Sequence, residues 1–290
     1  MHDLDQFLTR ANVLLDRLEN LLPAVAPVSV PAGQVLRWHA AGAQRGIHAA
    51  TLPTRTQLTE LQCIDRQKQL LDRNTRQFLA GLPANHALLW GPRGTGKSSL
   101  IRALLNHYQG QGLRLVEVAR GGLADLQEVC SALAAATGRF LLFCDDLSFG
   151  ADDVRYRSLK SVVDGSASGL PDNVLIYATS NRRHLIPEYM RENLDSHIQD
   201  GELHFSEAVE EKLSLSERFG IWVAFHPFTQ DQYLQIVSYW IRHLAPNTDD
   251  LSESMERAAL QWALERGSRS GRSAWQFARD WTGRRQLDTQ

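Results

Sequence analysis

Three glycines, one lysine and three hydroxyl side chains follow one another in the segment GPRGTGKSS, residues 91–99. Glycine has no Cβ, so the backbone can turn until successive N–H groups point into one hollow, and such a nest binds phosphate. In this spacing the lysine reaches the β- and γ-phosphates of a nucleotide, and the hydroxyl after it holds Mg²⁺. We therefore expect Lys97 and Ser98 in these two roles. The residues expected to form the loop are Gly91, Pro92, Arg93, Gly94, Thr95, Gly96, Lys97, Ser98 and Ser99.

Two adjacent carboxylates, Asp145 and Asp146, follow the apolar run LLFC at residues 141–144. A site that hydrolyses a nucleotide needs a carboxylate for Mg²⁺ and a group that orients water. Asp145 is the expected Mg²⁺ partner, and Asp146 is the expected base that polarises the attacking water. A pair of aspartates is also common at a helix N-cap or in a turn. The preceding apolar run and the position 48 residues after Lys97 favour the catalytic interpretation.

A third polar group ends the apolar run at residues 173–180, where the chain continues YATSN to Asn181. An amide at the end of a strand beside the phosphate loop can hydrogen-bond a phosphate or the attacking water. Asparagine is equally common as a turn former at strand ends. The residues alone leave both interpretations of Asn181 open.

The elements that must hold these groups alternate between two patterns. Short apolar runs at 86–90, 113–118, 140–145, 173–180 and 221–225 predict strands, and the stretches 98–107, 125–136 and 153–163 predict helices between them. Apolar strands separated by helices are typical of a parallel sheet buried on both faces. The phosphate loop then belongs at the carboxyl edge of this sheet.

The chain divides into three parts on this interpretation. Residues 58–227 form the α/β domain, and residues 228–290 form a small all-helical domain with helices at 230–244, 252–266 and 272–282. Residues 1–57 hold one helix, at 4–22, and then an irregular connector broken by prolines. The helix at 4–22 carries one apolar stripe, which either packs on its own domain or docks a partner.

Composition places the chain among globular proteins that have a core of their own. It has 290 residues, 43% of them hydrophobic and 22% charged, and a net charge of −2, so no global basic field attracts nucleic acid. Three cysteines without paired spacing suit a reducing compartment, and we interpret them as small buried apolar residues. Because no targeting segment or run of ~18 apolar residues occurs, we expect a soluble cytoplasmic protein with no membrane association.

The motifs GPRGTGKSS, LLFCDD, YATSN, LSERFG (215–220) and GRSAWQF (271–277) together resemble the AAA-plus ATPases over roughly residues 58–285. The phrases IDRQK (64–68) and CDDLSFG (144–150) look most like a bacterial family of single-module ATP-binding proteins of unknown function. This resemblance implies a P-loop NTPase fold: a five-stranded parallel sheet carries the P-loop, and a helical lid closes over the nucleotide. It also implies these roles: Lys97 and Ser98 in Walker A, Asp145 and Asp146 in Walker B, Asn181 as sensor 1, Arg218 as the arginine finger and Arg272 as sensor 2.

Three of these assignments carry an alternative or a departure. Arg218 either stabilises charge on a phosphate of a neighbouring subunit or pairs with Glu217 at the surface. Arg269 is close enough to replace Arg272 as the lid arginine, although the glycine before Arg272 favours that residue. Most AAA-plus proteins have glutamate where this chain has Asp146, so its carboxylate is expected about one methylene further from the water, with slow hydrolysis as the result.

The resemblance also suggests the ligands and partners. The segment 61–68 matches the place where such proteins seat adenine, with Ile64 as its hydrophobic residue, so we expect ATP and Mg²⁺ as cofactors. The first functional hypothesis is a homo-oligomeric ring, of which a hexamer is one form, that uses ATP to remodel an unidentified protein client.

The alternatives belong to other classes of protein. An ATP-gated nucleic-acid adaptor, similar to bacterial helicase loaders, is supported by the basic residues 182–184. Against it, residues 188–217 contain nine acidic and two basic residues, and an acidic surface repels phosphate backbones. This stretch either meets a basic client or forms a solvated face. A small-molecule kinase is the weakest alternative, because no acceptor site is recognisable in the sequence.

Overall fold

The computed structural model describes residues 28–51, 56–149, 153–164, 170–181, 197–199, 202–204, 215–246 and 252–287. The helix expected at 4–22 and the basic residues 182–184 lie outside these ranges. Of the acidic stretch, only short pieces lie inside them, among them the antiparallel pair β7 (His197–Gln199) and β8 (Glu202–His204).

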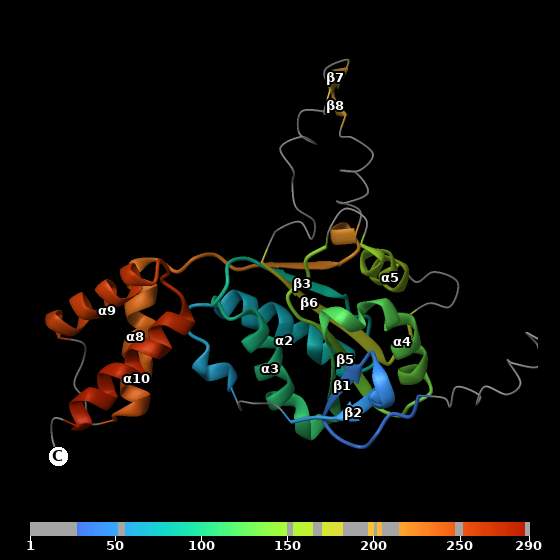
Figure 1. Cartoon of the computed structure of the whole chain (residues 1–290), viewed down its shortest axis with the longest axis horizontal. Helices are drawn as coiled ribbons and strands as arrows, with labels where there is room; N and C mark the ends of the chain where they lie inside the picture. Colours follow the sequence, from blue (N-terminus) through green and yellow to red (C-terminus); the bar gives the residue numbers. More distant parts are fainter. Residues whose placement is uncertain are drawn as a thin grey trace, which may run out of the picture.

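A seven-stranded sheet with the order β2-β1-β4-β5-β6-β3-β9 forms the centre of the described chain (Figure 1). Five of its strands are parallel neighbours and correspond to the five predicted apolar runs, so the predicted parallel sheet is confirmed. β3, which leads into the P-loop, lies between β6 and β9. These strands are β3 (Ala87–Trp90), β4 (Leu113–Val118), β5 (Arg139–Cys144), β6 (Val174–Ser180) and β9 (Ile221–Ala224).

Two further strands extend the sheet beyond β4, and here the expected irregular connector is wrong for residues 35–49. β1 (Val35–His39) runs parallel to β4, and β2 (Gly46–Ala49) pairs with β1 in the antiparallel sense. The alternation of β1 explains its place, because Leu36 and Trp38 are buried while Arg37 points to solvent. Only five residues carry this alternation, which is too short to stand out beside the neighbouring prolines and glycines.

Helices cover both faces of the sheet (Figure 1). Odd strand residues such as Leu89 and Phe143 share one hydrophobic cluster with α2 (Asp65–Leu79) and α3 (Lys97–Tyr108). Even residues such as Leu88 and Leu142 share the other cluster with α4 (Leu126–Ala134) and α5 (Val154–Val163). Burial on both faces accounts for the unbroken apolar runs seen in the sequence. Short 3₁₀ turns occur at 42–44, 58–60, 109–111 and 120–125.

Three helices follow the last strand and form a lid beside the sheet (Figure 1). Thr229 begins the first of them with a capping box, in which its hydroxyl and the side chain of Gln232 bond each other's backbone N–H. The lid helices pack on one another and share the cluster of α2 and α3, so the lid is joined to the α/β core by apolar contact. They are α8 (Gln230–Leu244), α9 (Glu253–Glu265) and α10 (Gly271–Leu287).

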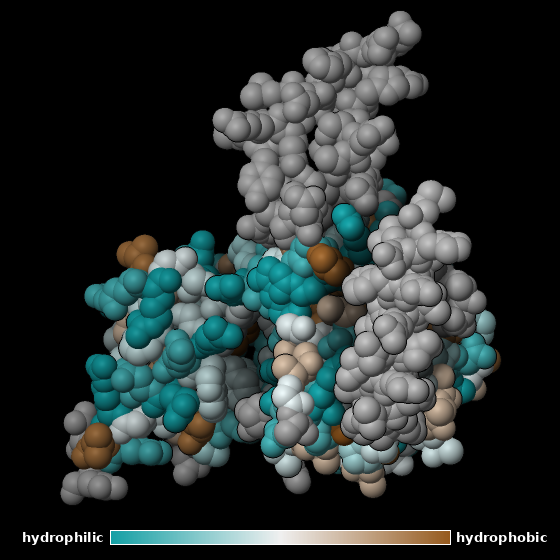
Figure 2. Space-filling view, turned by 45° about the vertical axis from the view of Figure 1, so that its right-hand side comes forward, coloured by the Kyte–Doolittle hydropathy of each residue, from teal (hydrophilic) through white to brown (hydrophobic). Residues whose placement is uncertain are grey.

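The surface of this lid is hydrophilic over most of the face that Figure 2 shows, with isolated apolar residues between charged ones. No helix of the described residues is long and apolar enough to cross a membrane. Cys130 and Cys144 are buried as expected, and burial raises the pKa of Cys130 to about 12. Cys63 is only half-buried, which corrects the expectation for that residue, because it lies beside the lid with its Sγ 3.3 Å from Gln235 Oε1.

Candidate functional site

The P-loop leaves β3 and passes into α3 by three left-handed glycines. Gly91, Gly94 and Gly96 have φ values of +140°, +76° and +102°, which side chains with a Cβ rarely adopt. Gly91 also lies against β9, where an added Cβ would stand 2.0 Å from the carbonyl oxygen of Phe225. Glycine is therefore required at this position by contact as well as by conformation.

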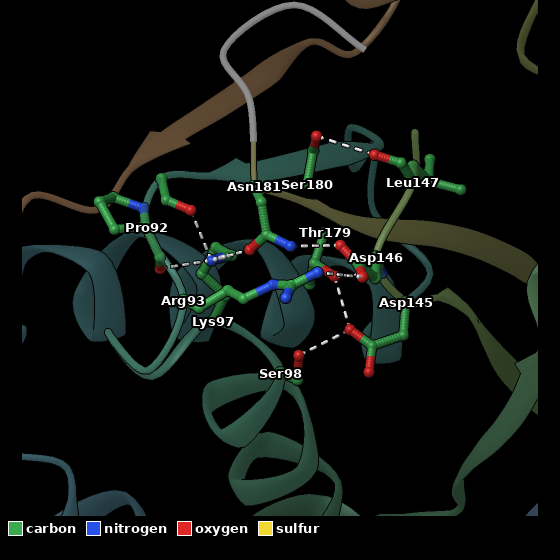
Figure 3. A network of polar contacts seen from close by, with 11 residues as sticks. Pro92, Arg93, Lys97, Ser98, Asp145, Asp146, Leu147, Thr179, Ser180 and Asn181 are labelled. Atoms are coloured by element: carbon green, nitrogen blue, oxygen red, sulfur yellow. Dashed lines mark hydrogen bonds and ion pairs between the residues drawn. The ribbon is translucent and has the colours of Figure 1, made fainter. Parts of the chain in front are cut away.

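Lys97 is buried at the centre of the loop, with 7% of its surface exposed. Its Nζ donates to the carbonyl oxygens of Gly91 and Pro92, both at 2.7 Å, and to Asn181 Oδ1 at 3.2 Å (Figure 3). Burial lowers the pKa of Lys97, and the nearby carboxylates act against that shift. The loop thus holds one partly desolvated cation, directed toward the end of β6.

Asp145 lies at the end of β5 and accepts two hydrogen bonds on the same oxygen, Oδ1. The hydroxyls of Ser98 and Thr179 each donate to it at 2.6 Å. Its other oxygen is 3.7 Å from the guanidinium of Arg102. Ser98 and Asp145 therefore bring two hard oxygen atoms together beside a phosphate loop, which is the donor chemistry that Mg²⁺ takes. The residues present fit a magnesium ion held between them.

Asp146 has a left-handed backbone, with φ +54°. Its N–H donates to Thr179 Oγ1 at 2.9 Å, and its Oδ1 accepts from Asn181 Nδ2. Its Oδ2 lies 3.6 Å from Arg93 of the P-loop. The carboxylate is 55% exposed, so water reaches it. Asn181 thereby bridges Lys97 and Asp146, using its oxygen for one and its nitrogen for the other.

The remaining loop residues are also near one another. Thr95 is buried and its hydroxyl donates to the Pro92 carbonyl at 2.9 Å, and Ser99 is half-buried in the first turn of α3. Ile64 is buried just before α2, and its Cδ1 would be 3.5 Å from a Cβ on Gly96. The predicted adenine residue is therefore in contact range of the loop.

A cavity of about 630 Å³ separates part of the P-loop from the lid. Its lining includes Pro92, Arg93 and Thr95 from the loop, Phe228 from the segment before α8, and Arg269 from the turn before α10. Ile64 is not among its lining residues. Apolar walls with two arginines are suited to an anionic ligand that carries an aromatic base.

Both candidate lid arginines lie near the P-loop. The Gly271 N–H donates to the Gly94 carbonyl at 2.9 Å, and a Cβ on Gly94 would be 3.6 Å from Arg272 Cβ. Arg269 lines the cavity described above. The structure brings both residues to the loop and does not separate their roles.

Arg218 is the one predicted site residue that does not join the others. It precedes the amino end of β9, whereas the P-loop follows the carboxyl end of the parallel neighbour β3. It forms an ion pair with Asp164 at the end of α5. Arg218 therefore cannot contact a phosphate held by the P-loop of its own chain.

Two residues of the site were missed in the sequence. Thr179 contacts both aspartates, and Arg102 contacts Asp145 from one turn further along α3 than Ser98. The i,i+4 spacing of Ser98 and Arg102 was a usable signal, because such residues share one helix face. For Thr179 the signal was weaker, because the polar end of the run YATSN does not indicate which face of the sheet each of its residues occupies.

A P-loop on a parallel sheet, with two aspartates and an asparagine at the neighbouring strand ends and a helical lid beside it, is the arrangement that the resemblance to the AAA-plus proteins implies. The chain belongs to the family described as "Protein of unknown function (DUF815)", whose sequence profile matches residues 32–285. This match confirms the resemblance to a family of unknown function.

Two other comparisons are more distant. A stretch of 129 residues is 26% identical to "AAA-ATPase At2g18193" of Arabidopsis thaliana, and the match spans 38% of this chain and about a quarter, 26%, of that protein. The structure of a point variant of Thermotoga maritima RuvB matches at 16% identity and a TM-score of 0.49, over 77% of this chain and 63% of that chain. The RuvB Holliday junction branch migration motor of the same organism matches at 17% identity and a TM-score of 0.46, with the same coverage of 77% and 63%. The order of the strands in the central sheet defines the fold.

Proposed function

We propose that this protein is a Mg²⁺-dependent ATPase that works as a homo-oligomer and couples ATP turnover to remodelling of a protein partner. One observation carries the enzymatic part of this proposal. Side chains from α3 and from the ends of β5 and β6 meet in one network, with Asp145 bonded to Ser98 and Thr179, and Lys97 linked to Asp146 through Asn181. A nucleotide-binding loop without catalysis has no need for the second carboxylate.

Each residue then has a role that its contacts support. Lys97 would bind phosphate and release the two carbonyl oxygens and the Asn181 oxygen that it now contacts. Ser98 and Asp145 would hold the metal ion. Asp146 accepts the proton of the attacking water, and Asn181 orients that water or the phosphate. When bound, Mg²⁺ would act as a Lewis acid that polarises the phosphoryl group of ATP. Arg269 or Arg272 reports the lid position to the same site.

The position of Arg218 supports a site shared between subunits. Because it precedes the amino end of β9, Arg218 lies at the opposite edge of the sheet from the P-loop of its own chain, where a guanidinium could act on a nucleotide held by another copy. We therefore propose a ring in which Arg218 of one subunit completes the site of the next. Its ion pair with Asp164 fixes it to α5 until such contact forms.

We also propose a class of client and a cellular location for this ATPase. We favour a protein client in the cytoplasm over a nucleic-acid adaptor, because residues 188–217 carry nine acidic and two basic side chains and an acidic surface repels phosphate backbones. The basic residues 182–184 that suggested it lie outside the described ranges. A nucleic-acid client would be recognised by binding that weakens steeply with salt.

The test is ATP hydrolysis per chain, measured at saturating Mg²⁺ and ATP as protein concentration rises. A shared site predicts that specific activity rises with concentration and levels off as oligomers form. Lys97→Ala serves as the inactive control. Flat specific activity from a monomeric chain would refute the shared site while leaving the ATPase intact, and absence of any hydrolysis would refute the enzyme itself.

A further inference from the structure

Thr179 contacts both aspartates of the site through a single hydroxyl. Oγ1 donates to Asp145 Oδ1 at 2.6 Å and accepts from the Asp146 N–H at 2.9 Å (Figure 3). A hydroxyl has one donor hydrogen and two acceptor lone pairs, so both bonds are made at once. The residue is 1% exposed, so water cannot replace these bonds without rearrangement.

The left-handed backbone at Asp146 is the second observation. A non-glycine residue with φ +54° is uncommon, and aspartate is among the residues that tolerate it. Three hydrogen bonds from β6 hold the turn: the bond from the Asp146 N–H to Thr179 Oγ1, that from the Leu147 N–H to the Thr179 carbonyl at 2.7 Å, and that from Ser180 Oγ to the Leu147 carbonyl at 2.9 Å. Such over-determination is what keeps a rarely populated conformation in place.

The turn decides where the short Asp146 side chain ends. From this backbone its carboxylate already bonds Asn181 and approaches Arg93. Although its side chain is one methylene shorter than that of glutamate, Asp146 reaches both partners from this left-handed backbone.

We infer that Thr179 is a positioning residue that fixes Asp145 for the metal and sets the turn through which a short aspartate serves as the base. This inference rests on the proposed function, because it takes Asp146 to be that base. It differs from a packing role, which valine would fill as well as threonine. A packing role also predicts no effect on the metal.

The experiment compares Thr179→Val, which removes the hydroxyl at nearly equal volume, with Thr179→Ser, which keeps it. Three properties are measured: affinity for a fluorescent ATP analogue in EDTA, affinity for Mn²⁺ in the presence of ATP by electron paramagnetic resonance, and turnover. We expect the valine variant to bind nucleotide unchanged in EDTA. Its Mn²⁺ affinity should fall about 10-fold or more, and its turnover should fall on the order of 10²-fold. The serine variant should stay close to the unmodified chain.

A second variant tests the turn and does not depend on a buried substitution. Asp146→Glu restores the residue that most AAA-plus proteins have, yet we expect its turnover to fall, because a longer side chain from this backbone overshoots Asn181. Faster hydrolysis by Asp146→Glu, or unchanged Mn²⁺ affinity and turnover in Thr179→Val, would overturn the inference. If the unmodified chain binds Mn²⁺ and ATP without hydrolysis, the proposed function fails, and the Mn²⁺ affinity of Thr179→Val still decides whether Thr179 positions Asp145.

Discussion

Substituting Gly91 by alanine tests whether β9 holds the P-loop in place. The added Cβ would stand 2.0 Å from the Phe225 carbonyl oxygen, whereas Cβ atoms essentially never approach another atom within 3.0 Å. The loop and β9 must therefore separate by at least the difference between these distances. The hydrogen bond from the Phe225 N–H to the Trp90 carbonyl, 2.8 Å long, lies beside this contact and is the first to be lost.

Two costs set the magnitude. Alanine at φ +140° is strained by about 1–3 kcal/mol, and the lost hydrogen bond adds about 1 kcal/mol. We expect the free energy of unfolding to fall by roughly 2–4 kcal/mol. A shift of about 1 Å in a catalytic group lowers rate on the order of 10²-fold, and turnover should fall by that amount in the fraction that remains folded.

Urea unfolding followed by circular dichroism measures the first effect, and ATP hydrolysis well below the unfolding midpoint measures the second. Gly283→Ala is the matched control, because it lies in α10 with no atom within 4 Å of the added Cβ. It should stabilise the protein by up to about 1 kcal/mol without altering hydrolysis. An unchanged urea midpoint and unchanged turnover in Gly91→Ala would refute the described contact between the loop and β9.

Three other substitutions test the site. Lys97→Ala should weaken ATP binding by about 3 kcal/mol, or more than 10²-fold, since a buried cation is lost; an affinity by calorimetry equal to that of the unmodified chain would contradict the P-loop assignment. Asp146→Asn should keep ATP bound and lower turnover by about 10²–10⁴-fold, and full hydrolysis by this variant would mean that another group orients the water. Mixing Arg218→Ala with Lys97→Ala chains should restore activity that neither has alone, and no recovery in verified mixed oligomers would count against a shared site.

The pattern of apolar residues predicted helices and strands well where it was long and where residues typical of a helix or strand end flanked it. The strand at 113–118 and the helix at 230–244 have the predicted bounds. The helix ends are set by local chemistry, with the Thr229 cap before it and Pro246 after it. β1 and β2 could not be predicted this way, because β1 pairs with β4, some 80 residues further along the chain, and β2 pairs with β1.

The site was predictable in its residue types and not in its connections. Asp145, Asp146 and Asn181 are recognisable in the sequence as polar groups at strand ends. The sequence does not show that Asn181 bridges Asp146 to Lys97, nor that Thr179 joins the two aspartates, because these contacts depend on which strands are neighbours. The sequence also does not show the left-handed backbone of Asp146, and the slow hydrolysis expected from its short side chain stays a prediction.

The P-loop is held from two sides, and this arrangement links the parts that an oligomeric ATPase must coordinate. On one side Gly91 lies against Phe225, at the carboxyl end of β9, and on the other Gly94 accepts a hydrogen bond from Gly271 of the lid. Arg218, which is proposed to act on the nucleotide of a neighbouring subunit, lies just before the amino end of β9. The four residues of β9 therefore separate it from the P-loop contact at Phe225. Packed strands shift as units rather than bend. A displacement of Arg218 by a neighbouring nucleotide therefore has a short and rigid connection to the P-loop, and through Gly94 to the lid.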